Sequence, residues 1–236
     1  QNRDFAAPLP YFPAWNERSM DKKVRIMVTL REYLQNPCQA LSLPYWKSKQ
    51  GPVPENIKIV HQSDDSASVL AEQAAEPYFR LIHHLGHTPR EALKGFCIKT
   101  AELSDIPQIV QIVNSSYPDL SVDEAQMLSY TQMPAYCEDL WIFVYETRTH
   151  TAVGCGIADF DQEAREGVLE WIQVLPAWRR QGVGTLLVKE LLCRIKEKQA
   201  RFATVSGRAD NPSQPEKLYR RCGFSGEDVW LIVRKN

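Results

Sequence analysis

The segment whose residue types and spacing most clearly indicate a chemical function is the glycine-containing run at 179–184, Arg-Arg-Gln-Gly-Val-Gly. It stands between an apolar stretch at 168–174, predicted as a β-strand, and a stretch at 183–196 whose apolar residues recur on one helix face. Backbone N–H groups at the start of a helix are unpaired and attract anions, and glycine lets an anion approach the main chain closely. The order strand, glycine loop, helix therefore predicts a binding site for a diphosphate.

Two other phosphate-binding loops do not fit this segment. A P-loop requires Gly-Lys followed by Ser or Thr, whereas Gly184 is followed by Thr185. A dinucleotide fingerprint requires a small residue three positions after its second glycine, where Leu187 stands. The diphosphate prediction therefore depends on the position of the glycines between a strand and a helix.

Glu170 is the one ionisable residue of the stretch 168–174, which we expect to be a central, mostly buried strand. Strand alternation is expected to place it on the same side as Ile172 and Val174. Partial burial favours the protonated form of a carboxyl group, which suits proton transfer near neutral pH. Glu170 is therefore a candidate general base, and the alternative is a strand glutamate that is exposed or paired with a cation.

The elements that must position these residues alternate between strands and helices. Strands are predicted at 96–100, 140–146, 152–159, 168–174, 203–207 and 228–234, and helices at 104–113, 122–133, 183–196 and 213–221. This alternation around one mixed sheet predicts an α/β (α+β) fold.

The first 90 residues are less regular. The predicted elements are strands at 24–28, 41–46 and 57–61, a helical turn at 29–35, and a helix at 69–85 that ends at Gly86. We expect a small N-terminal α/β lobe at 1–90, too poor in apolar residues to be independent, followed by a larger domain at 95–236.

Composition and charge exclude several classes of function. The 236 residues include 28 basic and 29 acidic ones, a net charge of −1, so no nucleic-acid or membrane partner is expected. No apolar run approaches the roughly 18 residues needed to cross a bilayer, and the first residues do not resemble a signal peptide. The six cysteines lie far apart and are expected to be reduced and mostly buried. A cytoplasmic location is therefore expected.

Three histidines, His83, His84 and His87, are close enough in sequence to suggest a metal site. No cluster of cysteines or carboxylates lies near them in the sequence to complete one. We therefore expect them to form the polar end of a helix, and we expect no metal.

Two separated motifs resemble the GNAT superfamily of N-acetyltransferases. One is V-x-P-x-W-R-x-x-G-x-G at 174–184, and the other is L-Y-x-x-x-G-F at 218–224. The resemblance covers 95–236 and implies a mixed, mostly antiparallel central sheet flanked by helices, with acetyl-CoA as the cosubstrate and no metal. The segment at 36–47 resembles one that precedes GNAT domains in some bacterial proteins, but it implies no activity.

The resemblance also implies how the cosubstrate binds. The main chain of the glycine loop would hold the coenzyme A pyrophosphate through Arg179, Arg180, Gln181, Gly182, Val183, Gly184 and Thr185. The backbone of Ile172 and Val174 would pair with the pantetheine arm, and Asn211 would approach the cofactor. Asn211 lies eight residues before Tyr219, one more than the family spacing, and Pro215 replaces the usual alanine.

Two catalytic residues follow from the same resemblance. Glu170 would accept the amine proton directly or through a water, and Tyr219 would protonate or hydrogen-bond the leaving thiolate; the alternative for Tyr219 is a core tyrosine. The expected reaction is direct acetyl transfer to a primary amine, of a small molecule rather than a protein, by a monomer or homodimer. The alternatives are a protein-amine acetyltransferase and a catalytically silent acyl-CoA-binding sensor.

The loops at 114–135 and 160–166 are expected to surround the acceptor, and the N-terminal lobe either walls this site or has a purely structural role. The acidic residues in and next to these two loops either attract a cationic amine or are simply solvated. These residues are Asp119, Asp123, Glu124, Asp159, Asp161, Glu163 and Glu166.

Overall fold

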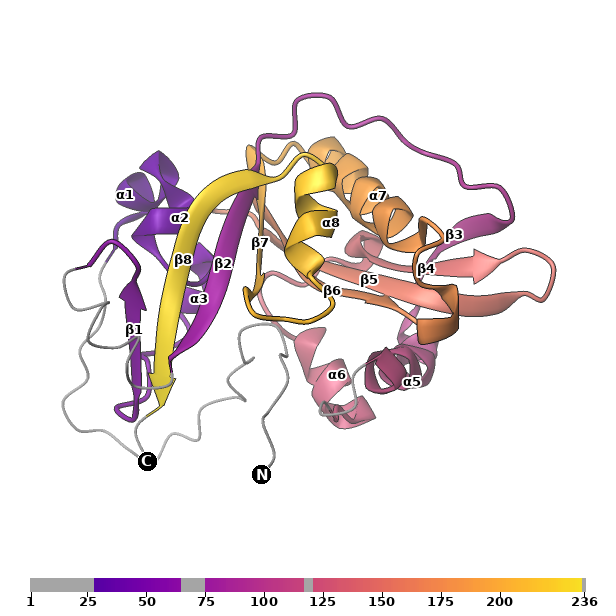
Figure 1. The fold of residues 1–236 in the computed structure, drawn as a ribbon, viewed down its shortest axis with the longest axis horizontal. Helices are drawn as coiled ribbons and strands as arrows, with labels where there is room; N and C mark the ends of the chain where they lie inside the picture. Colours follow the sequence, from indigo (N-terminus) through magenta and orange to yellow (C-terminus); the bar gives the residue numbers. More distant parts are fainter. Residues whose placement is uncertain (1–27, 65–74, 117–120, 235–236) are drawn as a thin grey trace.

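One eight-stranded sheet runs through the protein (Figure 1). The computed structural model describes residues 28–64, 75–116 and 121–234, and all statements below concern these ranges. The strand order is β1-β8-β2-β7-β6-β5-β4-β3, and every neighbouring pair is antiparallel except β6 and β7. The strands are β1 (Ile57–His61), β2 (Glu76–His83), β3 (Phe96–Thr100), β4 (Trp141–Glu146), β5 (Thr151–Asp161), β6 (Glu166–Val174), β7 (Phe202–Arg208) and β8 (Ser225–Arg234).

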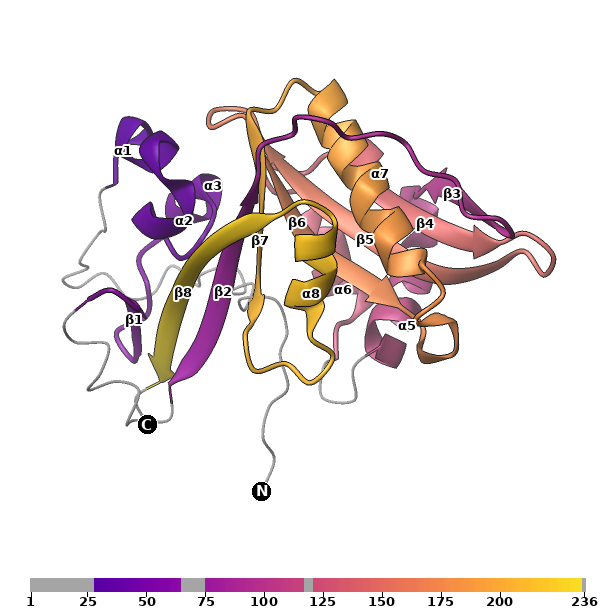
Figure 2. The same cartoon turned by 45° about the horizontal axis from the view of Figure 1, so that its top comes forward.

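Helices cover both faces of this sheet (Figures 1 and 2). They are α1 (Leu30–Gln35), α2 (Pro37–Ala40), α3 (Tyr45–Ser48), α5 (Ile106–Ser116), α6 (Glu124–Tyr130), α7 (Val183–Glu197) and α8 (Pro215–Arg221). Helices α7 and α8 lie on one face, α5 and α6 on the other, and α1 to α3 lie beside β2 and β8. The predicted mixed, mostly antiparallel sheet flanked by helices is confirmed. Within the described ranges no helix is long and apolar enough to cross a membrane.

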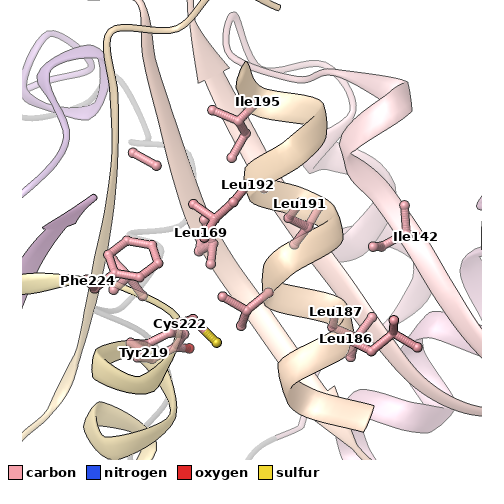
Figure 3. Packing of buried hydrophobic residues seen from close by; sticks show 14 of the residues in the cluster. Ile142, Leu169, Leu186, Leu187, Leu191, Leu192, Ile195, Tyr219, Cys222 and Phe224 are labelled. Carbon is pink, nitrogen blue, oxygen red and sulfur yellow. The ribbon is translucent and has the colours of Figure 1, made fainter. Parts of the chain in front are cut away.

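The larger core lies between the sheet and α7 (Figure 3). Leu187, Leu191 and Ile195 of α7 are fully buried, as their spacing predicts. They pack against Leu169 of β6 and the apolar residues that follow α8. Burial of each such side chain contributes about 1.5–3 kcal/mol, so this face fixes where α7 begins and hence where its N-terminal turn lies.

The predicted helix at 69–85 is wrong. Residues 65–74 lie outside the described ranges, and Glu76–His83 forms β2, between β8 and β7. Tyr78, Phe79 and Leu81 are all buried, because a central strand is covered on both faces. Such a strand has no alternating pattern, so periodicity does not distinguish it from a buried helix. His83 is the last residue of this strand, and His84 and His87 follow it. His83 Nδ1 accepts a hydrogen bond from the Leu85 N–H at 2.9 Å.

The N-terminal segment gives mixed outcomes. The helical turn at 29–35 is confirmed as α1, which Thr29 and Glu32 cap reciprocally, and the strand at 57–61 is confirmed as β1. The predicted strand at 41–46 is wrong, because a single helical turn, α3, begins directly after Pro44. The predicted strand at 24–28 lies almost entirely outside the described residues.

A buried polar network joins α1 to the sheet. The Tyr33 hydroxyl donates to Glu166 at 2.7 Å and accepts from Arg80 at 2.8 Å, while Thr204 also donates to Glu166. Arg80 and Glu166 are almost completely buried, so each depends on the other for its charge to be tolerated. Residues of the expected N-terminal lobe thus reach β6 and β7, and β1 and β2 belong to the same sheet as the other strands. The division at 90–95 stays a prediction.

A tight contact between β6 and α7 can be tested by adding one methyl group. A Cβ at Gly167 would overlap the buried side chain of Ile195. We expect Gly167→Ala to lower the free energy of unfolding by about 1–3 kcal/mol, the usual effect of overpacking. Urea denaturation measures this, with Gly86→Ala as the control, because a Cβ there would meet no atom within 4 Å. Equal stability of the two variants would contradict the packing described for α7.

Candidate active site and cosubstrate cleft

The candidate site is a cavity of about 680 Å³ where β6 and β7 part. These strands pair only between Glu166–Leu169 and Phe202–Val205, so the rest of β6 has a backbone edge that β7 does not cover. The cavity is lined by residues of β6, the loop before α7, β7 and α8, together with Ser116 at the end of α5. Ten of the twelve predicted site residues line it: Glu170, Ile172, Val174, Arg179, Arg180, Gly182, Gly184, Thr185, Asn211 and Tyr219.

A β-bulge at Glu170 shapes the inner end of this cavity. Leu169 pairs with Ala158 and Trp171 with Ile157, so Glu170 is the extra residue. The bulge interrupts the alternation: Trp171 packs in the cluster with α5, whereas Ile172 and Val174 pack towards α7. Glu170, Ile172 and Val174 nevertheless all line the cavity.

The glycine loop brings main-chain donors to the opposite end. Gly182 has a φ of 89° and precedes α7 with no side chain that caps the helix. The N–H groups of the first turn, including Gly184 and Thr185, have no carbonyl partner within the helix. A Cβ at Gly184 would lie 3.2 Å from Leu218, so this glycine also lets α8 approach α7. The arrangement fits a diphosphate, since it offers several N–H groups at the positive end of a helix dipole.

Arg179 has a structural task in addition to any contact with an anion. Its Nε donates to the Val174 carbonyl at 3.0 Å, and its Nη2 donates to the Ser116 carbonyl at 2.8 Å. The guanidinium thus ties the end of β6 to α5 beside the cavity, which Arg179 and Ser116 both line. Two predicted residues do not line the cavity: Gln181, whose amide donates to the Ala177 carbonyl, and Val183, which is buried in the core.

Tyr219 and Asn211 come from the other wall. The Tyr219 ring is mostly buried, with its centroid 6.2 Å from that of Phe79 and 5.8 Å from that of Phe224. Asn211 Oδ1 accepts from the N–H and the hydroxyl of Ser213 at 2.9 and 2.8 Å, which shapes the loop before α8. Tyr219 thus packs in the core and lines the cavity at the same time.

Sequence reasoning missed the most important neighbour of Glu170. Lys47 of α3 lies with its Nζ 2.6 Å from Glu170 Oε1, and the two side chains are only 13% and 9% exposed. Nothing in the local sequence pairs them, because 123 positions separate them. The sequence feature that comes closest to predicting this contact is the place of Lys47 in the segment 36–47 of the N-terminal lobe, which we expect to wall the acceptor site or to have a structural role.

Asp159 completes this polar cluster. It is buried on β5, and no described residue hydrogen-bonds its Oδ2. Burial raises the pKa of Asp159 well above its ordinary value, the charge of Glu170 adds to this increase, and Lys47 opposes it. Asp159 is therefore expected to retain its proton where an exposed aspartate would not.

Four of the other acidic residues have partners within the described ranges. Asp123 caps α6, Asp161 accepts N–H bonds in the turn after β5, and Glu163 pairs with the exposed Lys49. Glu166 belongs to the buried network, and Asp119 lies outside the described residues. Among the described residues no group of histidines, cysteines and carboxylates could hold a metal. The six cysteines are unpaired, and four of them are buried.

Comparison with known proteins defines the class to which this cleft belongs. Residues 138–226 match the family model for the acetyltransferase (GNAT) domain. The match spans β4 to the start of β8 and so includes the bulge, the glycine loop and α8. The chain therefore contains a domain of the GNAT acetyltransferase family.

Solved structures share this fold at low sequence identity. A GCN5-related N-acetyltransferase from Sphaerobacter thermophilus aligns with a TM-score of 0.66 and 20% identity over 80% of this chain; this chain covers 62% of that protein. A GNAT-family acetyltransferase from Colwellia psychrerythraea aligns at 0.56 and 12% identity, covering 79% of this chain and 67% of the other. A fungal region described as a GCN5-related glucosamine N-acetyltransferase aligns at 0.58 and 10% identity, covering 73% and 23%. A search of curated protein sequences found no significant match.

The raised pKa of Asp159 predicts a pH-dependent effect on stability. A carboxyl that holds its proton more tightly in the folded state stabilises the fold at low pH, and this contribution is lost as the pH rises. Asp159→Asn cannot ionise, so its free energy of unfolding relative to the wild type should increase between about pH 4 and about pH 8.

Urea denaturation at several pH values measures this difference. Asp139→Asn is the control with the opposite sign, because the hydrogen bond from Lys198 lowers the pKa of Asp139. Its relative stability should fall as the pH rises to about 5 and stay level above that, because a carboxyl with a lowered pKa titrates only in acid. If the curves for Asp159→Asn and the wild type stay parallel, Asp159 is not buried in the way described.

Gly182 provides a test of the loop itself. A side chain at a φ of 89° is strained by about 1–2 kcal/mol, so Gly182→Ala should displace the main-chain N–H groups. We expect the dissociation constant for coenzyme A, measured by calorimetry, to rise at least about tenfold. The Gly86→Ala variant should bind as the wild type does. An unchanged constant for Gly182→Ala, in folded protein, would contradict an anion site at this loop.

Proposed function

We propose that this protein transfers the acetyl group of acetyl-CoA to a primary amine by direct attack in a ternary complex. The observation that carries the proposal is that one cavity joins the N-terminal turn of α7, Glu170 and Tyr219. Anion-binding N–H groups at one end and a carboxylate at the other are separated by the uncovered backbone edge of β6. This is the arrangement that acyl transfer from a diphosphate-bearing thioester requires.

Each group has one role in this proposal. The main chain of 179–185 binds the pyrophosphate, and the backbone at Ile172 and Val174 holds the pantetheine arm. Glu170 accepts a proton from the amine as its nitrogen bonds to the thioester carbon, and the carbon–sulfur bond then breaks. Tyr219 donates a proton or a hydrogen bond to the departing sulfur.

A small-molecule acceptor fits the site better than a protein. The region around Glu170 is enclosed on the N-terminal side by α3, whose Lys47 contacts it. With α3 packed here, we expect a small amine rather than an extended peptide to reach Glu170. One structural neighbour is described as a glucosamine N-acetyltransferase region, which is in keeping with a small acceptor for this fold.

One observation favours a second candidate, a catalytically silent acyl-CoA-binding module. Glu170 is already paired with Lys47, so it is not free to act as a base unless that pair opens. The two candidates differ in a simple measurement. An acetyltransferase releases free thiol from acetyl-CoA when amines are supplied, whereas a silent module is stabilised against heat by acetyl-CoA but releases none.

Substitution of the proposed catalytic residues should separate catalysis from binding. Glu170→Gln removes the proton acceptor and should lower kcat by about 10²–10⁴-fold, while Tyr219→Phe should lower it by about 10²-fold at most. Neither should change the dissociation constant of coenzyme A appreciably, because neither residue belongs to the glycine loop. Thiol release measures kcat, and calorimetry measures binding.

Matched controls are available for both substitutions. Glu163→Gln changes an exposed glutamate paired with Lys49, and Tyr136→Phe changes a tyrosine that packs on Trp141 outside the cavity. Both should retain the wild-type rate. Full activity of Glu170→Gln on every amine that the wild type acetylates would remove Glu170 from the mechanism.

A further inference from the structure

The lining of the cavity carries a large excess of positive charge. Among the described residues that line it, Glu170 is the one carboxylate. Five lining residues are cations: Arg179, Arg180, Arg208, Lys217 and Arg221. The composition of the chain does not account for this excess, because the chain has 28 basic and 29 acidic residues. The excess is therefore a property of the cavity.

Two of these cations already have partners within the protein. Arg179 donates to two main-chain carbonyls, and Arg208 forms an ion pair with Asp210 at 2.6 Å. The side chains of the other three form no ion pair or hydrogen bond with any described residue: these are Arg180, Lys217 and Arg221. Cations that lie close together without an anion repel one another, so an anionic ligand would stabilise this arrangement.

The three cations without partners come from two elements that border the same end of the cavity. Lys217 and Arg221 lie four residues apart on α8, so they share one face of that helix. Helix α8 packs beside the first turn of α7, where a Cβ at Gly184 would come within 3.2 Å of the Leu218 side chain. Figure 2 shows both helices on the same face of the sheet. Arg180 belongs to the glycine loop, directly before α7.

Coenzyme A has two separate phosphate groups, the pyrophosphate and a monoester on the 3′-hydroxyl of its ribose. A phosphate monoester carries about 1.5–2 negative charges near neutral pH, whereas the N-terminal end of a helix supplies only about half a positive charge. The N–H groups of α7 suit the pyrophosphate and leave the monoester without a partner. Cationic side chains that have no carboxylate of their own are the groups that such a phosphate requires.

We propose that Lys217 and Arg221, together with the Arg180 side chain, bind the 3′-phosphate of coenzyme A and select acyl donors that carry it. This inference rests on the acetyl transfer proposed above and specifies the donor for that same site. A thioester on the phosphopantetheine of a carrier protein has no 3′-phosphate, so it is expected to be a poor donor. The three cations determine specificity and take no part in the proton transfers, which belong to Glu170 and Tyr219.

Calorimetry with coenzyme A and dephospho-coenzyme A tests this assignment, because the two ligands differ only in the 3′-phosphate. At low salt we expect the wild type to bind coenzyme A at least about tenfold more tightly. Lys217 and Arg221 are exposed, so salt should screen their charges and reduce this preference. The double variant Lys217→Met/Arg221→Met should lose most of the preference. Its dissociation constant for dephospho-coenzyme A should stay close to that of the wild type, which also shows that the variant is folded.

Arg220→Gln is the matched control, because it removes one positive charge from the same helix. Arg220 pairs with Glu216 and does not line the cavity, so this variant should keep the preference of the wild type. Equal binding of the two ligands by the wild type would overturn the proposal. A preference that survives in the double variant, or that is lost equally in Arg220→Gln, would overturn it as well.

The same measurements separate this proposal from the proposed acetyl transfer. If folded wild-type protein bound neither ligand, the cleft would not be a coenzyme A site, and both proposals would fall. If the preference for coenzyme A were found but no amine caused thiol release from acetyl-CoA, the 3′-phosphate site would stand and the acetyl transfer would not.

Discussion

The structure depends on the point at which β6 and β7 stop pairing, just after Leu169. On one side of this point the strands are held together by the buried network around Glu166. On the other side they separate, and the bulge at Glu170 turns β6 away from regular pairing. The separation creates a cavity between the strands, where backbone groups of β6 are not paired with β7. The remaining elements stabilise this opening from its two ends.

The larger part of the fold was predictable because its signals are local. The apolar spacing of α7, the glycine before it and the strand preceding it are all read within about thirty residues, and the structure has them as predicted. β2 was not predictable in the same way, because a strand covered on both faces lacks a polar–apolar alternation. The sequence also predicts a strand at 41–46. Tertiary packing of Tyr45 and Trp46, which are both buried, supports one helical turn there instead.

For the site, the sequence predicts residues but not the contacts between them. The two motifs, at 174–184 and 218–224, meet in one cavity, which Gln181 and Val183 do not line. The bulge at Glu170 inserts one residue into the strand, and no alternation rule anticipates such an insertion. The contact with Lys47 crosses 123 positions. Ion pairs of that kind follow from topology, so they become visible only when the N-terminal helices are placed beside the sheet. The cytoplasmic location and the division into two domains stay predictions.

The two ends of the cavity differ in charge, and this difference bears on the whole catalytic cycle that we propose. The glycine loop presents uncompensated N–H groups and attracts an anion, whereas Lys47 and Glu170 compensate each other. An amine enters the inner end as an ammonium ion and competes with Lys47 for Glu170. Once it is acetylated its nitrogen carries no charge, so it no longer competes, and the ion pair can re-form. In this scheme the re-formed ion pair favours release of the amide after the reaction.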